Sequence, residues 1–493
     1  MKILIIYPDF PELNAGGCFY TGVASLSAVL KQAGHEVDFY HICFPVEKTE
    51  LQDRLLAFEP DVIAFSSTSP MFQYVARWLP WVKEVSAAYV VCGGVHCRMA
   101  PERVLQIEGI DAVCHGEGEL SFATLLERLS TGRNYYDIPN FAFKTSKGTI
   151  KNPLELIKDL DSLPDPERMV FNHAKLYDYT KEGRASYAAF MCSRGCPFEC
   201  AYCSNKRLKQ DYADKGKYVR FYSAKRLIQQ IKDHYKLLPD TEYVRIDDSN
   251  INLNRAWFTE FISLYKKEVN KPIMVQTRPD LVNEKVIKSL KEAGCFILLM
   301  GLEHGNQNMR KDVLNRPLKD EAVLNAFQLC HKYGLPTRSF NMVGLPTETI
   351  DGVLETVKLN ARVKPFDIST SIFYPFPYTA LADYCEERKL RLKPTYMKAW
   401  PNTILEQDSI HHEDVLFFYK AFHILVFVYS VAPSSEHWKT YDNFLHDWLK
   451  DMRGKWHPGL FEEIGALDAQ IHALYKNHHH PDLSNSSNLL FRI

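Results

Sequence analysis

Residues 191–203 read Met-Cys-Ser-Arg-Gly-Cys-Pro-Phe-Glu-Cys-Ala-Tyr-Cys and place three thiols, Cys196, Cys200 and Cys203, at the spacing CxxxCxxC. Three thiols on one short loop can converge on three corners of an iron-sulfur cube, which leaves the fourth iron open to a small molecule. The alternative is a zinc knuckle, but that site usually needs a second CxxC pair or added histidines, and no second pair follows. A triplet starting at Cys192 would lack its third thiol, so we expect Cys192 to be a small buried residue.

The run from Ser193 to Cys203 resembles the cluster loop of the radical S-adenosylmethionine (radical SAM) enzymes, and the resemblance extends over most of the chain. It implies that Cys196, Cys200 and Cys203 ligate a 4Fe-4S cluster whose open iron is chelated by SAM. An electron from the cluster would then cleave the sulfonium to a 5'-deoxyadenosyl radical. Tyr202 would line the SAM site. An external electron donor such as flavodoxin or ferredoxin would complete the system.

The composition limits the classes of partner and the compartment. A chain of 493 residues is long enough for two to four domains. Lysine and arginine number 59 against 60 acidic residues, so no overall field gathers nucleic acid. Twelve scattered cysteines fit a reducing compartment better than a disulfide framework. The first residues lack the features of a signal peptide, and we therefore predict a cytoplasmic protein.

Short apolar runs alternate with helical patterns over the first part of the chain. The predicted strands are Ile3–Tyr7, Val37–Tyr40, Val62–Ser66, Tyr89–Cys92 and Ala112–Cys114. This alternation predicts a doubly wound, Rossmann-like parallel sheet over residues 1–135. Because such sheets bind ligands beyond the carboxyl ends of their strands, we expect the loops after these strands to share one rim.

Four phrases in this domain, placed ahead of a radical SAM loop, resemble the cobalamin-binding domain of the B12-dependent radical SAM enzymes. These phrases are Pro60–Ile63, Ser66–Thr68, Gly93–His96 and Gly116–Glu119. The loop after the first strand has no Asp-x-His-x-x-Gly, which implies cobalamin held without a histidine ligand from the protein. The alternative is a domain of this fold that is kept empty as a scaffold or docking surface. The residues we predict at cobalamin are Ser66, Thr68, Phe72, Gly93, Gly94, His96, Gly116 and Glu117.

Six strand-then-helix units follow from residue 186 to residue 390. Their strands are predicted at Ala188–Cys192, Tyr243–Ile246, Ile273–Gln276, Phe296–Met300, Thr337–Met342 and Ile368–Phe373. Six units cannot close an eight-stranded barrel, so we predict a partial (β/α)6 barrel. Residues 136–185 are predicted to be a linker containing a small hairpin, and residues 391–493 a mainly helical region that could cap the substrate.

Polar residues follow several of these strands, at the end where barrels carry their sites. Asp247 and Asp248 lie where the family places acceptors for the SAM ammonium, although adjacent carboxylates also suit a helix cap or a solvated turn. Arg278 could hold the SAM carboxylate or form a structural ion pair with Glu303. The SAM-binding residues we predict are Tyr202, Asp247, Asp248, Gln276, Arg278, Glu303, Asn341, Gly344 and Phe373.

Three phrases depart from the family pattern that they resemble. In residues 301–305, which resemble Gly-Ile-Glu-Ser-Gly, His304 stands in place of Ser. In residues 344–349, which resemble Gly-Leu-Pro-Gly-Glu-Thr, Thr347 stands where Gly is usual, and Tyr378 replaces Gly in a Pro-Gly-Thr ending. Aromatic side chains near that ending could stack on adenine, but packing of the barrel mouth is the safer interpretation.

The stretch Val415–Tyr429 is intensely apolar, but Lys420 and His423 interrupt it and it falls short of about 20 residues. We expect a buried helix there and no stable membrane insertion.

These features together predict an enzyme that cleaves SAM at a 4Fe-4S cluster and, with cobalamin, methylates an unactivated carbon of a small molecule. The first alternative is a radical SAM dehydratase, cyclase or isomerase whose B12-like domain is empty or does not methylate. An iron-sulfur electron carrier or scaffold is the alternative from another class. The sequence identifies no catalytic residue and no particular substrate.

Overall fold

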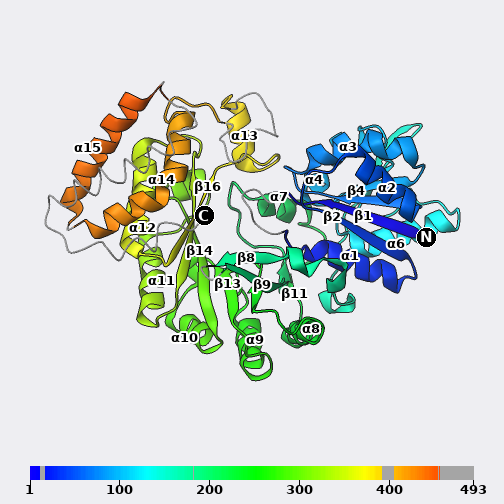
Figure 1. Cartoon of the computed structure of the whole chain (residues 1–493), viewed down its shortest axis with the longest axis horizontal. Helices are drawn as coiled ribbons and strands as arrows, with labels where there is room; N and C mark the ends of the chain where they lie inside the picture. Colours follow the sequence, from blue (N-terminus) through cyan, green and yellow to red (C-terminus); the bar gives the residue numbers. More distant parts are fainter. Residues whose placement is uncertain (11–16, 181–182, 391–404, 433, 454, 456–493) are drawn as a thin grey trace. The chain divides into compact units, whose positions relative to one another are not determined.

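A computed structural model describes residues 1–10, 17–180, 183–390, 405–432, 434–453 and 455 (Figure 1). The chain divides into two compact units. Unit 1 comprises Met1–Phe198, Ser204–Ile273 and Phe376–Tyr378, and unit 2 comprises Glu199–Cys203, Met274–Pro375 and Thr379–Ile493.

The first sheet, in unit 1, has the strand order β2-β1-β3-β4-β5-β6-β7. Its strands are β1 (Lys2–Pro8), β2 (Glu36–Ile42), β3 (Val62–Ser66), β4 (Tyr89–Gly93), β5 (Ala112–Cys114), β6 (Phe141–Thr145) and β7 (Gly148–Lys151). Strands β1 to β5 are parallel, which confirms the predicted doubly wound sheet. The order places the topological switch between β1 and β3, where such sheets bind their ligands.

The predicted hairpin is present as β6 and β7, but it pairs antiparallel with β5 and so extends the first sheet. Its first strand is buried because Phe141 and Phe143 are both 0% exposed, whereas all four residues of β7 are exposed. The hairpin was expected from its turn sequence, but the apolar side chains of β6 alone did not reveal which strand they would join.

Helices cover both faces of the first sheet because its central strands are apolar along their whole length. Ile3, Leu4, Ile5 and Ile6 are all 0% exposed, and burying such a side chain contributes about 1.5–3 kcal/mol. Figure 1 shows α1 and α6 on one face and α2, α3 and α4 on the other. These helices, with α5, span Thr21–Gln32 (α1), Lys48–Phe58 (α2), Phe72–Val85 (α3), Val95–Met99 (α4), Pro101–Leu105 (α5) and Gly118–Ser130 (α6).

The second large sheet has the order β16-β15-β14-β13-β12-β9-β8 and is the curled sheet of the predicted partial barrel. Its strands are β8 (Tyr177–Thr180), β9 (Gly183–Phe190), β12 (Tyr243–Ile246), β13 (Ile273–Thr277), β14 (Cys295–Glu303), β15 (Thr337–Val343) and β16 (Asp367–Ile372). Strands β9 and β12 are parallel, as are β14, β15 and β16. Strand β8, which the sequence did not predict, pairs antiparallel with β9.

Five of the seven described helices that alternate with these strands begin at side-chain caps. Ser223, Asn254, Asn283, Thr349 and Thr379 each accept a bond from a backbone N–H of the first helical turn, which satisfies a group that would otherwise lack a partner. The helices are α7 (Ser204–Asp211), α8 (Ala224–Leu237), α9 (Arg255–Glu268), α10 (Glu284–Glu292), α11 (Asp320–Lys332), α12 (Ile350–Val363) and α13 (Ala380–Glu387).

Two further helices of unit 2, α14 (His412–Val431) and α15 (Ser435–Met452), follow the barrel. Helix α14 is long and apolar enough to cross a membrane, with a mean hydropathy of 1.5 over 18 residues. It nevertheless packs as a core helix: Phe417, Phe418 and Phe422 are 0% exposed and share a hydrophobic cluster with α12 and α15. The predicted buried helix is confirmed. Residues 391–404 and 456–493 of the predicted cap lie outside the described residues.

Candidate functional site

The start of the cluster loop is held by Asp248, just beyond β12 in unit 1. Its Oδ2 accepts bonds from the backbone N–H groups of Cys192 (2.9 Å) and Ser193 (2.6 Å) and from Sγ of Cys192 (3.0 Å). Its Oδ1 accepts from Oγ of Ser193 (2.6 Å). Burial raises the pKa of Asp248, and these four bonds act in the opposite sense. Cys192 is fully buried, as predicted, and Asp248 fastens the loop.

A glycine turn leads from this anchored segment to the first thiol of the motif. Ser193 and Arg194 form the short strand β10, which pairs antiparallel with β11 (Arg220–Phe221). Gly195 has φ +88°, and a Cβ atom on it would lie 2.6 Å from the carbonyl oxygen of Tyr218. Only glycine fits this turn, because it combines a left-handed backbone with a close approach of two chains.

Cys196 lies at the end of this turn in unit 1 and is 7% exposed. The side-chain nitrogen of Asn250 lies 4.0 Å from its sulfur. The side-chain oxygen of Asn250 is buried and finds no hydrogen-bond partner among the described residues. A buried acceptor without a partner is costly, so this position suits a polar group bound beside the thiol. Asn250 was not among the predicted site residues, although it follows the predicted pair of aspartates by two positions.

Cys200 lies among cations in unit 2. The nearest guanidinium nitrogens of Arg278 and Arg316 are 3.8 and 3.9 Å from its sulfur. Asp280 holds Arg278 through two bonds of 2.9 Å, and the carbonyl oxygen of Gly301 accepts from Arg316 at 2.8 Å. Cysteine binds iron as the thiolate, so paired guanidinium groups suit this sulfur as a metal ligand. Arg316 was missed because its loop carries no periodic pattern.

Glu303 lies at the end of β14 in unit 2, in a backbone conformation unusual for its type. Its φ is +67°, and the register of β14 against β15 shifts between Gly301 and Glu303. Such irregularities re-aim side chains and concentrate at functional sites. Burial raises the pKa of Glu303, while Arg316, at 3.9 Å, and a hydrogen bond from Tyr202 act in the opposite sense. Arg278 contributes a weaker effect of the same sign as Arg316.

The remaining predicted SAM residues are mostly engaged with other groups of the protein. The side chain of Asn341 accepts from Asn360 at 2.7 Å and donates to Ser339 at 3.1 Å, inside the sheet. The N–H of Gly344 donates to Glu348 at 2.5 Å, and Phe373, 3% exposed, packs in a hydrophobic cluster. In unit 1, Asp247 pairs with Arg245 at 2.7 Å, and burial raises the pKa of Asp247. Gln276 lies on β13 and is partly exposed.

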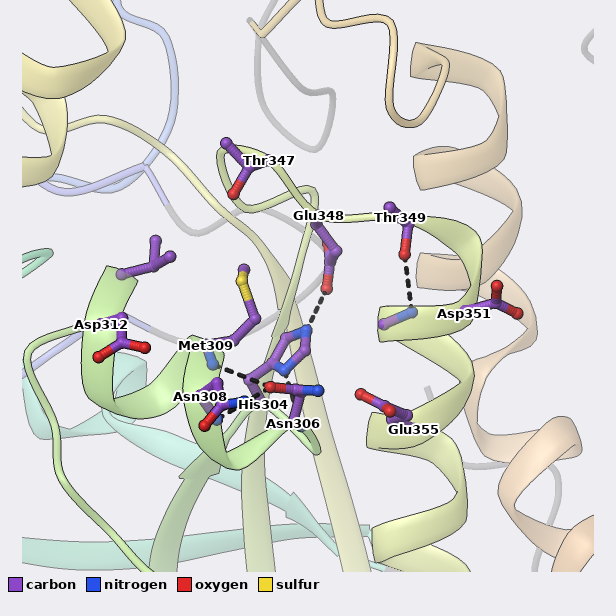
Figure 2. A pocket seen from close by; sticks show the side chains of 12 residues that line it. His304, Asn306, Asn308, Met309, Asp312, Thr347, Glu348, Thr349, Asp351 and Glu355 are labelled. Carbon is purple, nitrogen blue, oxygen red and sulfur yellow. Dashed lines mark hydrogen bonds and ion pairs between the residues drawn. The ribbon is translucent and has the colours of Figure 1, made fainter.

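The structure shows the surroundings of the three residues that depart from the family pattern, Thr347, Tyr378 and His304. Thr347 and Tyr378 have φ values of +66° and +65°, so the usual glycine is replaced at two positions whose backbone favours glycine. His304 is fully buried, and its Nε2 lies 2.9 Å from Oε1 of Glu348. Its Nδ1 accepts from the N–H of Asn306 at 2.9 Å (Figure 2).

A cavity of about 380 Å³ lies in unit 2, beyond the ends of β14 and β15 (Figure 2). It is lined by two segments, residues 304–313 and 347–355, which include Asp312, Asp351 and Glu355. The nine residues predicted to bind SAM are all described, and none of them lines this cavity. The cavity is therefore separate from the predicted SAM contacts.

The residues predicted at cobalamin come together in unit 1, at the carboxyl ends of adjacent strands. Ser66 pairs with Gly93 across β3 and β4. The ring of Phe72 stacks on His96 with centroids 4.1 Å apart, and Oγ of Ser69 lies 3.2 Å from Nδ1 of His96. Burial lowers the pKa of His96 to about 4, which keeps the ring neutral at pH 7.

Glycines on this rim are required by close approaches within the protein. Gly94 has φ +92°, and a Cβ atom on it would lie 2.6 Å from the carbonyl oxygen of Ser67. A Cβ atom on Gly116 would lie 2.1 Å from the side-chain oxygen of Asn140. Thr68 accepts backbone bonds from Met71 and Phe72 at the start of α3. These glycines let the rim loops pack together, and their contact with cobalamin stays a prediction.

Glu117, the last residue predicted at cobalamin, belongs to an ion-pair network in unit 1. Arg220 binds both of its oxygens, at 2.7 and 2.9 Å, and Arg194 lies 3.4 Å away. Arg194 also pairs with Glu119. Burial acts to raise the pKa of Glu117, but the bonds from Arg220 and the charge of Arg194 outweigh it and leave that pKa below its ordinary value. The network links the loop after β5 to the segment just before Cys196.

Comparison with known families finds two matches in the order expected. Residues 15–126 match the B12 binding domain, and residues 190–359 match the radical SAM superfamily.

Among curated proteins, the chain is 27% identical over 411 residues to an uncharacterized methyltransferase of Pyrococcus horikoshii, covering 81% of this chain and 86% of the relative. It is 26% identical to the anaerobic magnesium-protoporphyrin IX monomethyl ester cyclase of Rubrivivax gelatinosus, covering 77% and 69%. Among solved structures, the radical SAM methyltransferase TsrM of Kitasatospora setae, with cobalamin and a [4Fe-4S] cluster bound, gives a TM-score of 0.64 at 16% identity, covering 80% and 79%. The similarity to TsrM shows that the two chains share a fold.

Proposed function

Because the chain belongs to the radical SAM enzymes that carry an amino-terminal B12-binding domain, we propose that it methylates an unactivated carbon of a small-molecule substrate. The observation that carries this proposal is the order of the two domains, a B12-binding domain directly ahead of a radical SAM domain. The radical SAM domain implies a 4Fe-4S cluster and SAM, and the B12-binding domain implies cobalamin. Bound together, these groups supply radical chemistry and a carrier for the methyl group.

The side chains around the motif support Cys196, Cys200 and Cys203 as the cluster ligands. Asp248 fixes the loop from one side, and Arg278 and Arg316 present positive charge to Cys200. A zinc knuckle would require further thiol or imidazole ligands. An amide group lies next to the sulfur of Cys196, and two guanidinium groups lie next to that of Cys200, and neither kind of group is a usual zinc ligand.

The SAM contact best supported by the geometry is Glu303. Its side chain is 14% exposed, and a strained backbone and a bulge hold it beside Tyr202. A buried carboxylate near arginine can accept a hydrogen bond from an ammonium or a ribose hydroxyl. The chain's own part in the reaction is therefore to position the nucleotide and to keep the site dry.

Ring formation is the second candidate, and it rests on the similarity to the magnesium-protoporphyrin ester cyclase. Both candidate reactions need an external electron donor such as flavodoxin or ferredoxin. We also propose that the enzyme is cytoplasmic. Domain limits of 1–135, 136–185, 186–390 and 391–493 belong to the same proposal, with the last region as a substrate cap.

The decisive experiment measures cofactor content and turnover in oxygen-free protein reconstituted with iron, sulfide and cobalamin. We expect tight corrin absorbance, 5'-deoxyadenosine on addition of SAM and reductant, and transfer of label from methyl-labelled SAM to an accepted substrate. Cys200→Ala should abolish 5'-deoxyadenosine, and Cys330→Ala, a buried cysteine on α11, should not. If the protein binds no cobalamin, the methyltransferase proposal is wrong and a cyclase or isomerase is favoured. A fully loaded cluster that yields no 5'-deoxyadenosine would indicate an electron carrier.

A further inference from the structure

A cluster of three different ligand types lies at the carboxyl ends of β1 and β2, in unit 1. Asp9 Oδ2, His41 Nε2 and Cys43 Sγ all lie within 4.8 Å of one another. None of the three was predicted to contact SAM, the cluster or cobalamin. We propose that these residues bind a divalent transition metal of the zinc class.

The register of the two strands explains why these side chains meet. Pro8 pairs with Ile42, and the N–H of Asp9 continues the ladder by donating to the carbonyl of Ile42 at 2.8 Å. Asp9 therefore lies beside Cys43. His41 and Cys43 are two residues apart, so their side chains point to the same face of the sheet. The cluster thus follows from the pairing of β1 with β2 and needs no long-range loop closure.

The geometry at His41 favours a metal over a catalytic triad. Its Nε2 lies 2.8 Å from Oδ2 of Asp9 and 3.4 Å from Sγ of Cys43. A triad needs the carboxylate on one ring nitrogen and the nucleophile on the other. Here the oxygen and the sulfur converge on the same nitrogen, and Nδ1 is buried without a hydrogen-bond partner among the described residues. Three donor atoms of different kinds within 4.8 Å of one another can surround one metal ion.

The surroundings hold the three ligands in place. The side chain of His41 is 5% exposed, and the rings of Tyr7, Phe39 and Phe171 lie within 6 Å of its ring. A Cβ atom on Gly17 would lie 2.6 Å from Cε1 of His41 and 2.9 Å from Sγ of Cys43, so a larger residue there would crowd two of the three ligands.

The donor set selects the ion. Zinc accepts sulfur, imidazole nitrogen and carboxylate oxygen at about 2.0–2.3 Å, and three protein ligands leave a fourth position for water. Magnesium and calcium prefer oxygen alone. The spacings of His41 Nε2 to Asp9 and to Cys43, 2.8 and 3.4 Å, would have to open to surround such an ion. The side chain of Asp9 is 15% exposed, and its Oδ2 also accepts a bond from the backbone N–H of Cys18 at 2.6 Å.

The test measures zinc in the full chain, in a background where Cys196, Cys200 and Cys203 are replaced by serine so that the cluster loop cannot take the metal. We expect about one zinc ion per chain by elemental analysis after dialysis against zinc, with an absorption edge fitted by one sulfur and three nitrogen or oxygen ligands. Asp9→Asn, His41→Gln and Cys43→Ser should each lower zinc affinity by at least about tenfold.

Matched controls are His35→Gln, just before β2, and Cys92→Ser, a buried cysteine of β4. Both should retain about one zinc ion per chain. The edge spectrum is measured on the background chain with Asp9, His41 and Cys43 intact, so it remains informative if a variant fails to fold. Zinc content that is unchanged in the Cys43→Ser variant, or an edge without sulfur, would overturn the proposal. Neither outcome depends on SAM cleavage or methylation, so this proposal can fail independently of the proposed function.

Discussion

Two carboxylates lie at the ends of strands of the curled sheet, Asp248 in unit 1 and Glu303 in unit 2, and their hydrogen-bond partners differ. Asp248 accepts four hydrogen bonds from the cluster loop, which engage both of its oxygens. Glu303 is held beside Tyr202 and Arg316 by a left-handed backbone and a bulge. The sequence predicted both as SAM contacts. Their hydrogen bonds indicate that one fastens the loop and that the other is available to a ligand.

Removing the loop-fastening carboxylate should have the largest effect. Asp248→Ala leaves two buried N–H groups and two side-chain donors without an acceptor, and each unsatisfied group costs about 1–3 kcal/mol. We expect a loss of at least about 3 kcal/mol in the free energy of unfolding, together with poor retention of iron. Chemical denaturation and iron analysis measure the two effects. A variant as stable as the parent would show that Asp248 does not fasten the loop.

The corresponding change at the second carboxylate should act on SAM and leave the fold intact. For Glu303→Gln we expect a change in unfolding free energy below about 1 kcal/mol, because the amide keeps the size of the side chain. SAM affinity should fall about 10- to 100-fold, since a charge-assisted hydrogen bond is lost. Equilibrium dialysis of SAM against anaerobic protein measures this, with Glu268→Gln on the exposed end of α9 as the control. Unchanged affinity would refute the comparison.

Replacing two non-glycine residues that have a left-handed backbone, one in each unit, tests how much that conformation costs. Thr347 in unit 2 and Tyr378 in unit 1 both have left-handed backbones, which cost a residue with a Cβ about 1–2 kcal/mol. Thr347→Gly should raise the free energy of unfolding by about 0.5–1 kcal/mol after the greater freedom of glycine in the unfolded chain is counted. Tyr378→Gly should gain less, because it loses the contact of its ring with Arg103. Thermal unfolding of the two variants measures the two changes in stability. A loss of stability in Thr347→Gly would contradict the prediction.

The smallest expected effect is a pH dependence that belongs to Glu303. Because its folded-state pKa is raised above the unfolded value, the folded protein binds more protons between the two pKa values. The free energy of unfolding should therefore decrease as pH rises through that interval. Glu303→Gln should lack this component, so the difference between parent and variant should vary with pH. A difference that stays constant from pH 4 upward would show that Glu303 is not perturbed.

The sequence predicted the elements well because their apolar runs are local. The predicted bounds of Val62–Ser66, Ala112–Cys114 and Tyr243–Ile246 match those of β3, β5 and β12. Strand β8, Tyr177–Thr180, was missed because its pattern is too short to distinguish from a turn.

The charged contacts around the site could not be predicted in the same way. Arg220 meets Glu117 across 103 residues, and Arg316 meets Cys200 across 116. No local pattern marks either arginine as part of a site. Asp248 and Glu303 were both found by their positions at strand ends, but only their hydrogen bonds distinguish their roles.

The central claim is that Cys196, Cys200 and Cys203 hold a cluster with one iron open to SAM. Electron paramagnetic resonance of the reduced, oxygen-free protein tests it most directly. We predict the signal of a reduced 4Fe-4S cluster that changes on addition of SAM, and that is absent when Cys200 is replaced by alanine. A protein whose three thiols bind zinc, or whose cluster signal is indifferent to SAM, would contradict the account.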